Sequence, residues 1–269
     1  MRVFVSVDME GVAGVSTPDQ AYRGGHNYAA SQRLMTEEAN AAIAGAFDAG
    51  ATSVVVNDAH GTMDNLLPEQ LDERAELVNG RPKAQCMIQG LTREHDVALF
   101  VGFHAPAGSP GVFSHTLSSL AFTRFRVNGE TASETDLGVL QAAALGVPVG
   151  LVTGDDQICG LTRTAYPWIR TAQVKQAVGQ FSAHSVHPLR AREAIRAEAR
   201  AAVENAGRMP VPAVPDRLVL TVDLKTPLHA EIGALIPGMR QIDRLQLSFD
   251  AESPQQLLDV CALLWETAG

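Results

Sequence analysis

The sequence is poor in cysteine, and this bears on the compartment in which the protein is expected to work. Among its 269 residues there are only three cysteines, Cys86, Cys159 and Cys261, and they lie far apart. An odd number of widely spaced cysteines argues against a disulfide framework. We therefore expect reduced thiols in a cytoplasmic protein, because disulfides are rare in that compartment.

Long apolar runs are also lacking, although hydrophobic residues make up 46% of the chain. No stretch reaches the length of about 18 residues that a membrane-spanning helix needs. The apolar start, residues 1–7, ends at Asp8 and is too short for the hydrophobic part of a signal peptide. The composition therefore predicts a globular protein with a core of its own and without a membrane partner.

Positive charge is in deficit, with 21 lysines and arginines against 30 aspartates and glutamates and a formal net charge of −9. An acidic surface repels a phosphate backbone, so we expect no nucleic-acid partner. The same composition suits a cationic or zwitterionic ligand, or a metal site built from carboxylates.

The order of apolar segments predicts the fold class. Short apolar runs alternate with segments of helical periodicity along the first half of the chain. The expected strands cover residues 2–7, 52–57, 96–103 and 147–153, and the expected helices cover residues 31–49 and 134–145. Continuous apolar strands separated by helices are typical of a parallel sheet covered on both faces. We therefore predict an α/β fold in three layers around a mainly parallel sheet.

The last quarter of the chain has a different pattern. A long arginine-rich helix is expected over residues 184–207, and a proline-rich linker follows at residues 210–215. Beyond it we expect strand, helix, strand and helix over residues 217–223, 230–235, 244–249 and 254–267. We therefore predict an α/β domain over residues 1–208 and a smaller β-α-β-α unit over residues 209–269 that packs on it.

Side chains that commonly bind metals follow three of the expected strands. Asp8 and Glu10 come after the first strand, His60 after the second and His104 after the third. Because the carboxyl ends of parallel strands lie along one edge of a sheet, these side chains should converge there. Asp8 and Glu10 are two residues apart, so in extended backbone they point to the same side, as would suit two metal ions. Oxygen and imidazole ligands without thiolate favour zinc, manganese, iron or cobalt.

Each of these residues also has an ordinary structural interpretation. An aspartate after a strand is commonly a turn or cap residue, and a single histidine is commonly a hydrogen-bonding residue of the structure. Three strand ends that each carry such a residue favour a metal site over three coincidences. Asp155 and Asp156 follow a further strand, but there we prefer the interpretation as a turn or helix cap. His115 lies in a loop and is a candidate proton shuttle or nucleophile.

Several motifs occur together and in a fixed order. They are SVDMEG (6–11), TEEAN (36–40), NDAHG (57–61), GFHA (102–105), PGVFSHT (110–116), Asn128-Gly129 with Ser133-Glu134, and GVPVGLVTGDD (146–156). In sequence and spacing they resemble the M55 family of DppA-type D-aminopeptidases over roughly residues 1–180. The resemblance implies a zinc-dependent exopeptidase that releases an N-terminal D-amino acid from short peptides. It also implies a homo-oligomer, since the family is known for a ring-like decamer.

The resemblance further implies a role for individual residues. Two zinc ions would be held by Asp8, Glu10, His60, His104 and a glutamate after the Asn128-Gly129 turn, which corresponds best to Glu134. Relatives commonly have G-E-x-G-x at this last ligand, whereas this chain has Ser133-Glu134-Thr135-Asp136, so Glu130 and Asp136 remain alternatives. Ser133 and Asp136 also match a capping box at a helix start.

The catalytic histidine of the family corresponds to His115, either as nucleophile or as general acid and base, and residues 1–208 would form the metal-binding catalytic domain. No substrate-binding residue is identified.

Two other functions fit metal ligands at strand ends. Dinuclear phosphoesterases share that arrangement, but they typically begin with D-x-H and carry G-N-H, whereas this chain has D-x-E and no G-N-H. A non-enzymatic metal-containing protein that binds peptides would need no proton shuttle such as His115. We therefore favour the aminopeptidase.

Overall fold

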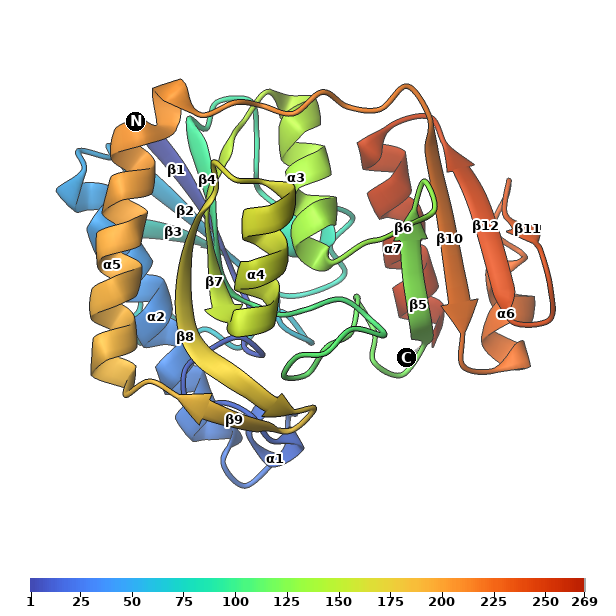
Figure 1. The fold of residues 1–269 in the computed structure, drawn as a ribbon, viewed down its shortest axis with the longest axis horizontal. Helices are drawn as coiled ribbons and strands as arrows, with labels where there is room; N and C mark the ends of the chain where they lie inside the picture. The colour runs from blue at the N-terminus through green and yellow to red at the C-terminus, as the bar shows by residue number, and fades with distance from the viewer. Residues whose placement is uncertain (269) are drawn as a thin grey trace.

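A mainly parallel sheet forms the centre of the protein in this computed structural model, which describes residues 1–268 (Figure 1). This sheet, sheet A, contains the strands Arg2–Val7 (β1), Ser53–Asp58 (β2), Ala75–Val78 (β3), Val97–Phe103 (β4), Val149–Asp155 (β7), Arg170–Gly179 (β8) and Ser182–Ser185 (β9). Their order is β3-β2-β1-β4-β7-β8-β9, and every neighbouring pair is parallel except β8 and β9. The predicted parallel sheet is therefore confirmed.

A second sheet, sheet B, is antiparallel and contains the strands of the C-terminal segment. It consists of Phe122–Val127 (β5), Glu130–Thr131 (β6), Leu218–Leu224 (β10), Arg240–Gln241 (β11) and Gln246–Ala251 (β12). The order is β11-β12-β10-β5-β6. The smaller α+β unit is thus confirmed as an element of the fold, but β5 and β6 join it from the middle of the chain. A division of the chain at residues 208 and 209 stays a prediction.

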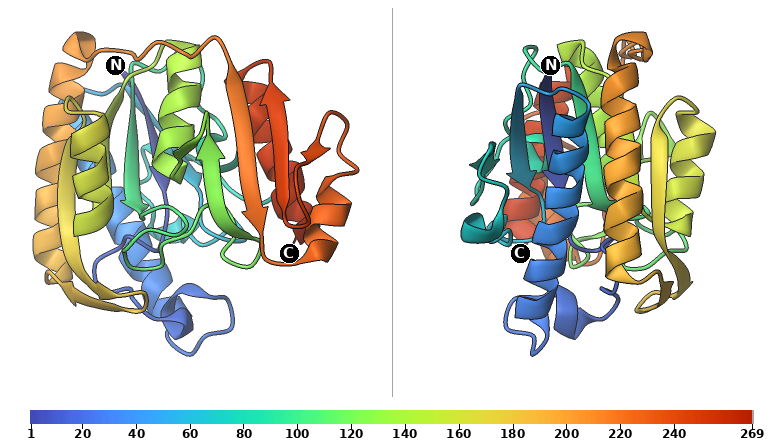
Figure 2. Two further views of the ribbon diagram at one scale, coloured as in Figure 1. Left: turned by 45° about the vertical axis from the view of Figure 1, so that its right-hand side comes forward. Right: turned by 90° about the vertical axis from the view of Figure 1, so that its left-hand side faces the viewer.

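The helices pack on both faces of sheet A and against sheet B. They are Pro18–Ala21 (α1), Tyr28–Asp48 (α2), Glu134–Leu145 (α3), Asp156–Ala165 (α4), Pro188–Asn205 (α5), Pro227–Gly233 (α6) and Pro254–Ala268 (α7). Helices α2 and α5 lie side by side on one face (Figure 2), and α3 and α4 cover the other. Helix α7 lies between α3 and sheet B (Figure 1).

Two hydrophobic cores follow from this layering, one on each face of sheet A. Val3, Val5 and Val7 of β1 point into the core under α2 and α5, and Phe4 points into the core shared with α3, α7 and sheet B. Alternate residues of a strand point to opposite faces, so a strand buried on both faces is apolar along most of its length. This is why the continuous apolar runs of the sequence identified the strands.

The structure differs from the prediction around residues 170–187. Helix α5 begins at Pro188 and not at residue 184, because His184 and Ser185 pair with β8 in the edge strand β9. Strand β8 was not predicted, since polar residues interrupt its apolar pattern. Among residues 1–268, no helix has the length and apolarity that a membrane span requires.

Candidate active site

The carboxyl ends of β2, β1 and β4 are neighbours in sheet A, and the predicted side chains meet there. Asp8 and Glu10 follow β1, His60 follows β2 and His104 follows β4, and all four are buried. The expected convergence is therefore present in the structure. Helix α1 and the β8–β9 hairpin lie at the same end of the molecule, the lower end in Figure 1.

The loop that leaves β1 is in direct backbone contact with the last residues of β4. The Gly11 N–H donates to the carbonyl of Gly102 at 2.7 Å. A Cβ atom on Gly102 would lie 2.2 Å from the Asp8 carbonyl oxygen, and the φ of +74° is one that side chains rarely adopt. Glycine is the residue that tolerates both conditions. The glycines of SVDMEG and GFHA therefore let the loop after β1 approach the end of β4, next to His104.

Carboxylates and imidazoles alternate across the site at short distances. His60 Nδ1 lies 2.7 Å from Glu10 Oε2 and 3.3 Å from Asp8 Oδ1. His104 Nε2 lies 3.4 Å from Asp8 Oδ2 and 3.3 Å from Glu134 Oε1. The five side chains for which the resemblance implies zinc ligation thus form one continuous buried cluster.

Glu134 reaches the cluster because it is the first residue of α3. The predicted capping box is confirmed: the Ser133 N–H donates to Asp136 Oδ2 at 2.7 Å and the Asp136 N–H donates to Ser133 Oγ at 3.1 Å. Capping therefore occupies Asp136, and Glu130 is exposed on β6. Of the three candidate carboxylates in this segment, Glu134 is the one that lies beside His104.

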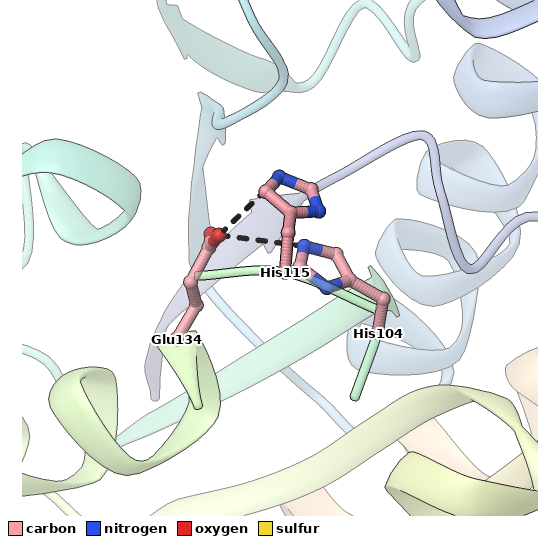
Figure 3. A group of neighbouring side chains, drawn as sticks. All are labelled: His104, His115 and Glu134. Carbon is pink, nitrogen blue, oxygen red and sulfur yellow. Dashed lines mark ion pairs between the residues drawn. The ribbon is translucent and has the colours of Figure 1, made fainter. Parts of the chain in front are cut away.

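His115 completes the arrangement from the loop between β4 and β5. Its ring stacks on that of His104, with centroids 4.1 Å apart and an angle of 7° between the planes. His115 Nε2 lies 4.0 Å from Glu134 Oε1, and Glu134 faces both imidazoles (Figure 3). His115 is therefore placed at the edge of the cluster, farther from its carboxylates than His104.

Each of the three histidines is oriented by a backbone carbonyl. One ring nitrogen of His60, His104 and His115 contacts a carbonyl oxygen, that of Ala21 at 2.7 Å, Ala105 at 3.0 Å and Phe113 at 2.7 Å, respectively. A nitrogen that donates to a carbonyl carries the proton, and in the neutral ring this leaves a lone pair on the other nitrogen. That second nitrogen faces the carboxylates in all three cases, which is the arrangement of metal-binding histidines.

The loop around His115 has a strained backbone. Phe113 and Leu117 have φ angles of 54° and 61°, in the left-handed region that costs a non-glycine residue about 1–3 kcal/mol. The Phe113 carbonyl accepts from His115 Nδ1, and the Leu117 N–H donates to Glu134 Oε1 at 2.9 Å. These two hydrogen bonds orient His115 and Glu134, and no feature of the sequence predicted the left-handed backbone that places them.

Lys175 supports the loop after β1, and the sequence pattern did not reveal it. This buried lysine of β8 donates from Nζ to the carbonyls of Glu10 at 2.5 Å, Val12 at 3.0 Å and Val15 at 2.5 Å. Glu38 of α2 accepts from the Ala13 N–H at 2.9 Å in the same loop. The sequence did not indicate a structural role for Lys175, because most lysines are exposed and the strand that carries it was not predicted.

The buried carboxylates determine the protonation of the site. Burial and the nearby Glu10 raise the pKa of Asp8 to about 8. Burial disfavours a charged His104, but Glu134 and Asp8 outweigh it and raise the pKa of His104 to about 10. Burial and the neighbouring His104 lower the pKa of His115. The cluster therefore attracts positive charge, whereas His115 is a neutral base near pH 7.

These residues fit a divalent metal such as zinc. His104 Nε2 is buried without a hydrogen-bond partner among the described residues, although it faces two carboxylates. Two sets of donor atoms each lie within 4.8 Å of one another: His104, His115 and Glu134, and Asp8, Glu10 and His104. Oxygen and imidazole donors without thiolate are a zinc-type set. The buried carboxylates, which attract positive charge, and the unpartnered His104 Nε2 both agree with a bound divalent metal.

A cavity of about 240 Å³ connects the cluster with solvent, and we call it the site cavity. Glu10, His60 and His115 line it together with Arg81 and Trp265. A small space of about 20 Å³ is lined by Asp8 and Glu134 and by the same Glu10, His60 and His115.

Asp155 and Asp156, considered above as an alternative site, have structural roles. Asp155 is the N-cap of α4 and accepts from the N–H groups of Gln157 and Ile158 at 3.1 and 3.0 Å. It also accepts from the Val112 N–H at 2.8 Å, which ties the His115 loop to sheet A. The cap interpretation is therefore confirmed.

Comparisons with known proteins agree with this geometry. The model of the peptidase M55 family, described as D-aminopeptidase, matches residues 1–263. A D-aminopeptidase of Bacillus subtilis (strain 168) is 36% identical over 240 residues, 88% of this chain and 86% of the relative. The solved structure of the Zn-dependent D-aminopeptidase DppA from Bacillus subtilis, described as a self-compartmentalizing protease, superposes with a TM-score of 0.95 and 32% identity. The match covers all of this chain and 98% of that chain.

The resemblance inferred from the motifs is thereby confirmed, and so is the expectation of a hydrolase. The chain belongs to the peptidase M55 family of D-aminopeptidases.

Proposed function

We propose that this protein is a zinc-dependent aminopeptidase that removes an N-terminal D-amino acid from short peptides. The observation that carries the proposal is the buried alternation of three carboxylates and three imidazoles at the sheet edge, with each imidazole anchored to a backbone carbonyl. Both relatives are named as D-aminopeptidases, and the solved one is named as Zn-dependent. Those names also favour the peptidase over a phosphoesterase and over a non-enzymatic peptide-binding protein.

Two zinc ions per chain would be held by Asp8, Glu10, His60, His104 and Glu134. The anchored imidazoles support this assignment because each directs a lone pair toward the cluster when neutral. Zinc held by these residues would supply Lewis acidity for a peptide carbonyl. The carbonyls of Ala21 and Ala105 hold His60 and His104 in one ring orientation, so the ligands are arranged before metal binding.

His115 is the proposed general base and acid. Its Nδ1 donates to the Phe113 carbonyl, so Nε2 is the atom that accepts a proton from the water molecule whose oxygen attacks the carbon of the peptide bond. The same Nε2–H then donates that proton to the nitrogen of the leaving amine as the C–N bond breaks, and His115 returns to its neutral form. Burial and the stacked His104 lower the pKa of His115, which keeps the imidazole neutral at the start. A role as nucleophile is the alternative that the sequence left open.

We propose that the protein assembles into a homo-oligomer of the kind that the resemblance implies, and we expect a decamer. The support comes from the solved relative, which is described as self-compartmentalizing. A cytoplasmic location remains the expectation from composition.

A panel of short peptides tests the proposal. We expect the zinc-loaded protein to release D-Ala from D-Ala-D-Ala and D-Ala-Gly-Gly much faster than L-Ala from the L isomers. N-acetylated D-Ala-D-Ala serves as control, because an aminopeptidase removes the first residue only when its amino group is free. Equal cleavage of the acetylated peptide, or no cleavage of any member with zinc, cobalt or manganese added, would contradict the proposal.

A further inference from the structure

A second cavity, of about 450 Å³, adjoins the site cavity, and we call it the distal cavity. Tyr22, His115, Ser119 and Leu120 line both spaces, so these four residues form the ridge between them. His115, the proposed proton carrier, is thus in contact with two separate spaces. The metal-binding cluster borders the site cavity through Glu10 and His60, and neither residue lines the distal cavity.

The wall of the distal cavity is aromatic and exposed. Tyr22 packs edge-on against Phe113 with centroids 6.3 Å apart, and Phe113 packs in the same way against Phe181 at 5.3 Å. Tyr22, Phe181 and Leu120 remain 44%, 47% and 69% exposed. An apolar ligand that covered them would remove this surface from water, which is favourable.

Two segments that are distant in sequence hold this wall in place. The Phe113 N–H donates to the Gln180 carbonyl at 2.9 Å, and Ser114 Oγ donates to Gln180 Oε1 at 3.0 Å. These contacts fix the tip of the β8–β9 hairpin, which carries Phe181, against the loop that carries His115. The distal cavity is therefore a built feature next to the proposed proton carrier.

A single cation lines the distal cavity. With histidine counted as neutral, Lys225 is the one charged side chain among the described residues of its lining. Its Nζ donates to the Ser119 carbonyl. An ammonium has three N–H donors, so this one hydrogen bond does not use all of them. In a chain of net charge −9, a cavity that combines an aromatic wall with a single positive charge favours a ligand with an anionic group and an apolar side chain.

The order of groups in a peptide substrate matches the order of these features. An aminopeptidase leaves one residue on the amino side of the scissile bond and the rest of the peptide on the other side. His115 gives its proton to the leaving amine, so the scissile bond must lie at the ridge. The metal-binding residues border the site cavity, which therefore takes the first residue, and the leaving peptide extends across the ridge.

We propose that the distal cavity binds the leaving part of the substrate, with an apolar side chain against Phe181 and Leu120 and the free C-terminal carboxylate at Lys225. This inference rests on the proposed function, because it assumes cleavage beside His115. It predicts a preference for short peptides that have an apolar second residue and an unblocked C-terminus.

The carboxylate is tested with D-Ala-D-Phe and its C-terminal amide. In the wild type we expect the KM of the amide to exceed that of the free acid by about fivefold, the size of a partly exposed ion pair. In Lys225→Met this ratio should fall to near one. Arg124→Met is the matched control, since it removes an exposed cation from the neighbouring strand β5 and should keep the wild-type ratio. An unchanged ratio in Lys225→Met would overturn the inference.

The apolar wall is tested with D-Ala-D-Phe and D-Ala-Gly. Phe181→Ala should raise the KM for D-Ala-D-Phe several-fold more than that for D-Ala-Gly. Val178→Ala, an exposed apolar truncation on the same hairpin, should raise neither. Light scattering on both variants tests the alternative that a second copy of the chain, and not the substrate, covers this wall. A smaller assembly of Phe181→Ala with an unchanged ratio of KM values would mean that a second copy of the chain covers the wall.

Calorimetric binding of the same peptides keeps this test separate from the proposed function. If no peptide is cleaved, weaker binding of D-Ala-D-Phe to Lys225→Met than to Arg124→Met still supports the distal cavity as a carboxylate site. Cleavage of D-Ala-D-Phe together with equal binding to both variants would leave the proposed function intact and refute this inference.

Discussion

At the scale of single residues, the histidines of the site differ in what their free nitrogen faces. His104 Nε2 lies within 3.4 Å of two carboxylates, whereas His115 Nε2 lies 4.0 Å from one. The rings are stacked and nearly parallel, and both nitrogens face Glu134 Oε1, but of the two only His104 also faces Asp8. This difference supports the proposed roles of His104 in metal binding and of His115 in proton transfer.

Removal of His115 should therefore separate binding from chemistry. We expect His115→Ala to retain zinc and to lose on the order of 10²–10⁴-fold in kcat, as for a general acid–base residue. His104→Ala is the comparison and should lose zinc together with activity. Metal content by mass spectrometry and kcat on D-Ala-D-Ala are measured for both. Loss of zinc from His115→Ala would make His115 a ligand, as one of the two donor sets permits.

The neighbouring acids of α3 allow a similar comparison. Glu134→Gln should lower zinc occupancy and activity steeply, because it removes one of three carboxylates from the buried cluster. Asp136→Asn should mainly lower the free energy of unfolding, by about 0.5–2 kcal/mol for a lost cap contact. Bound zinc and urea unfolding are measured side by side. Full zinc in Glu134→Gln with loss of zinc in Asp136→Asn would show that the fifth ligand was misassigned.

At the scale of elements, the crossing of the loop after β1 over the end of β4 sets the position of Asp8. Gly11 and Gly102 are in hydrogen-bonded backbone contact there, and Lys175 of β8 holds the first loop by three of its carbonyls. The site is thus built on backbone contacts between elements of one sheet.

A methyl group at Gly102 should disturb this crossing. Gly102 and Gly50 both have positive φ, +74° and +85°, but only the Cβ of Gly102 would meet other atoms, at 2.2 Å from the Asp8 carbonyl oxygen. Gly50→Ala should cost about 1–2 kcal/mol of unfolding free energy from backbone conformation alone. Gly102→Ala should cost about 1–3 kcal/mol more, because of overpacking, and should weaken zinc binding. If urea unfolding gave equal losses of unfolding free energy for Gly50→Ala and Gly102→Ala, the close backbone contact at this crossing would be contradicted.

The sequence predicted those elements whose signal is local. Strands β1, β2, β4 and β7 are buried on both faces, so their apolar runs are continuous, and Ser133 with Asp136 marked the start of α3 correctly. Strands β8 and β9 lie toward the edge of sheet A and have mixed composition, so no periodicity distinguished them. The left-handed backbone at Phe113 and Leu117 and the contacts of Lys175 depend on distant partners, which a single sequence does not reveal.

At the scale of the whole molecule, the chain leaves sheet A after β4, forms β5 and β6 in sheet B and returns at α3. His115 lies on the outward connection, and Glu134 lies at the return. The packing of sheet B on the α3 and α7 layer therefore determines where these two side chains stand relative to His104 (Figure 1).

The proposed assembly is tested by multi-angle light scattering. We expect a large homo-oligomer, near the mass of ten chains of 28.6 kDa. Chelation of the metal should leave this mass unchanged, because the donor cluster is buried within one chain. A monomer at micromolar concentration would contradict the assembly while leaving the site proposal untouched.

Zinc binding and turnover measured on the same sample test the central claim most directly. The protein is freed of metal with a chelator, dialysed and titrated with zinc, and bound zinc and hydrolysis of D-Ala-D-Ala are followed at each point. We predict no turnover without metal, saturation at up to two zinc ions per chain, and activity that rises with occupancy. Full turnover by protein that contains no metal would contradict the account.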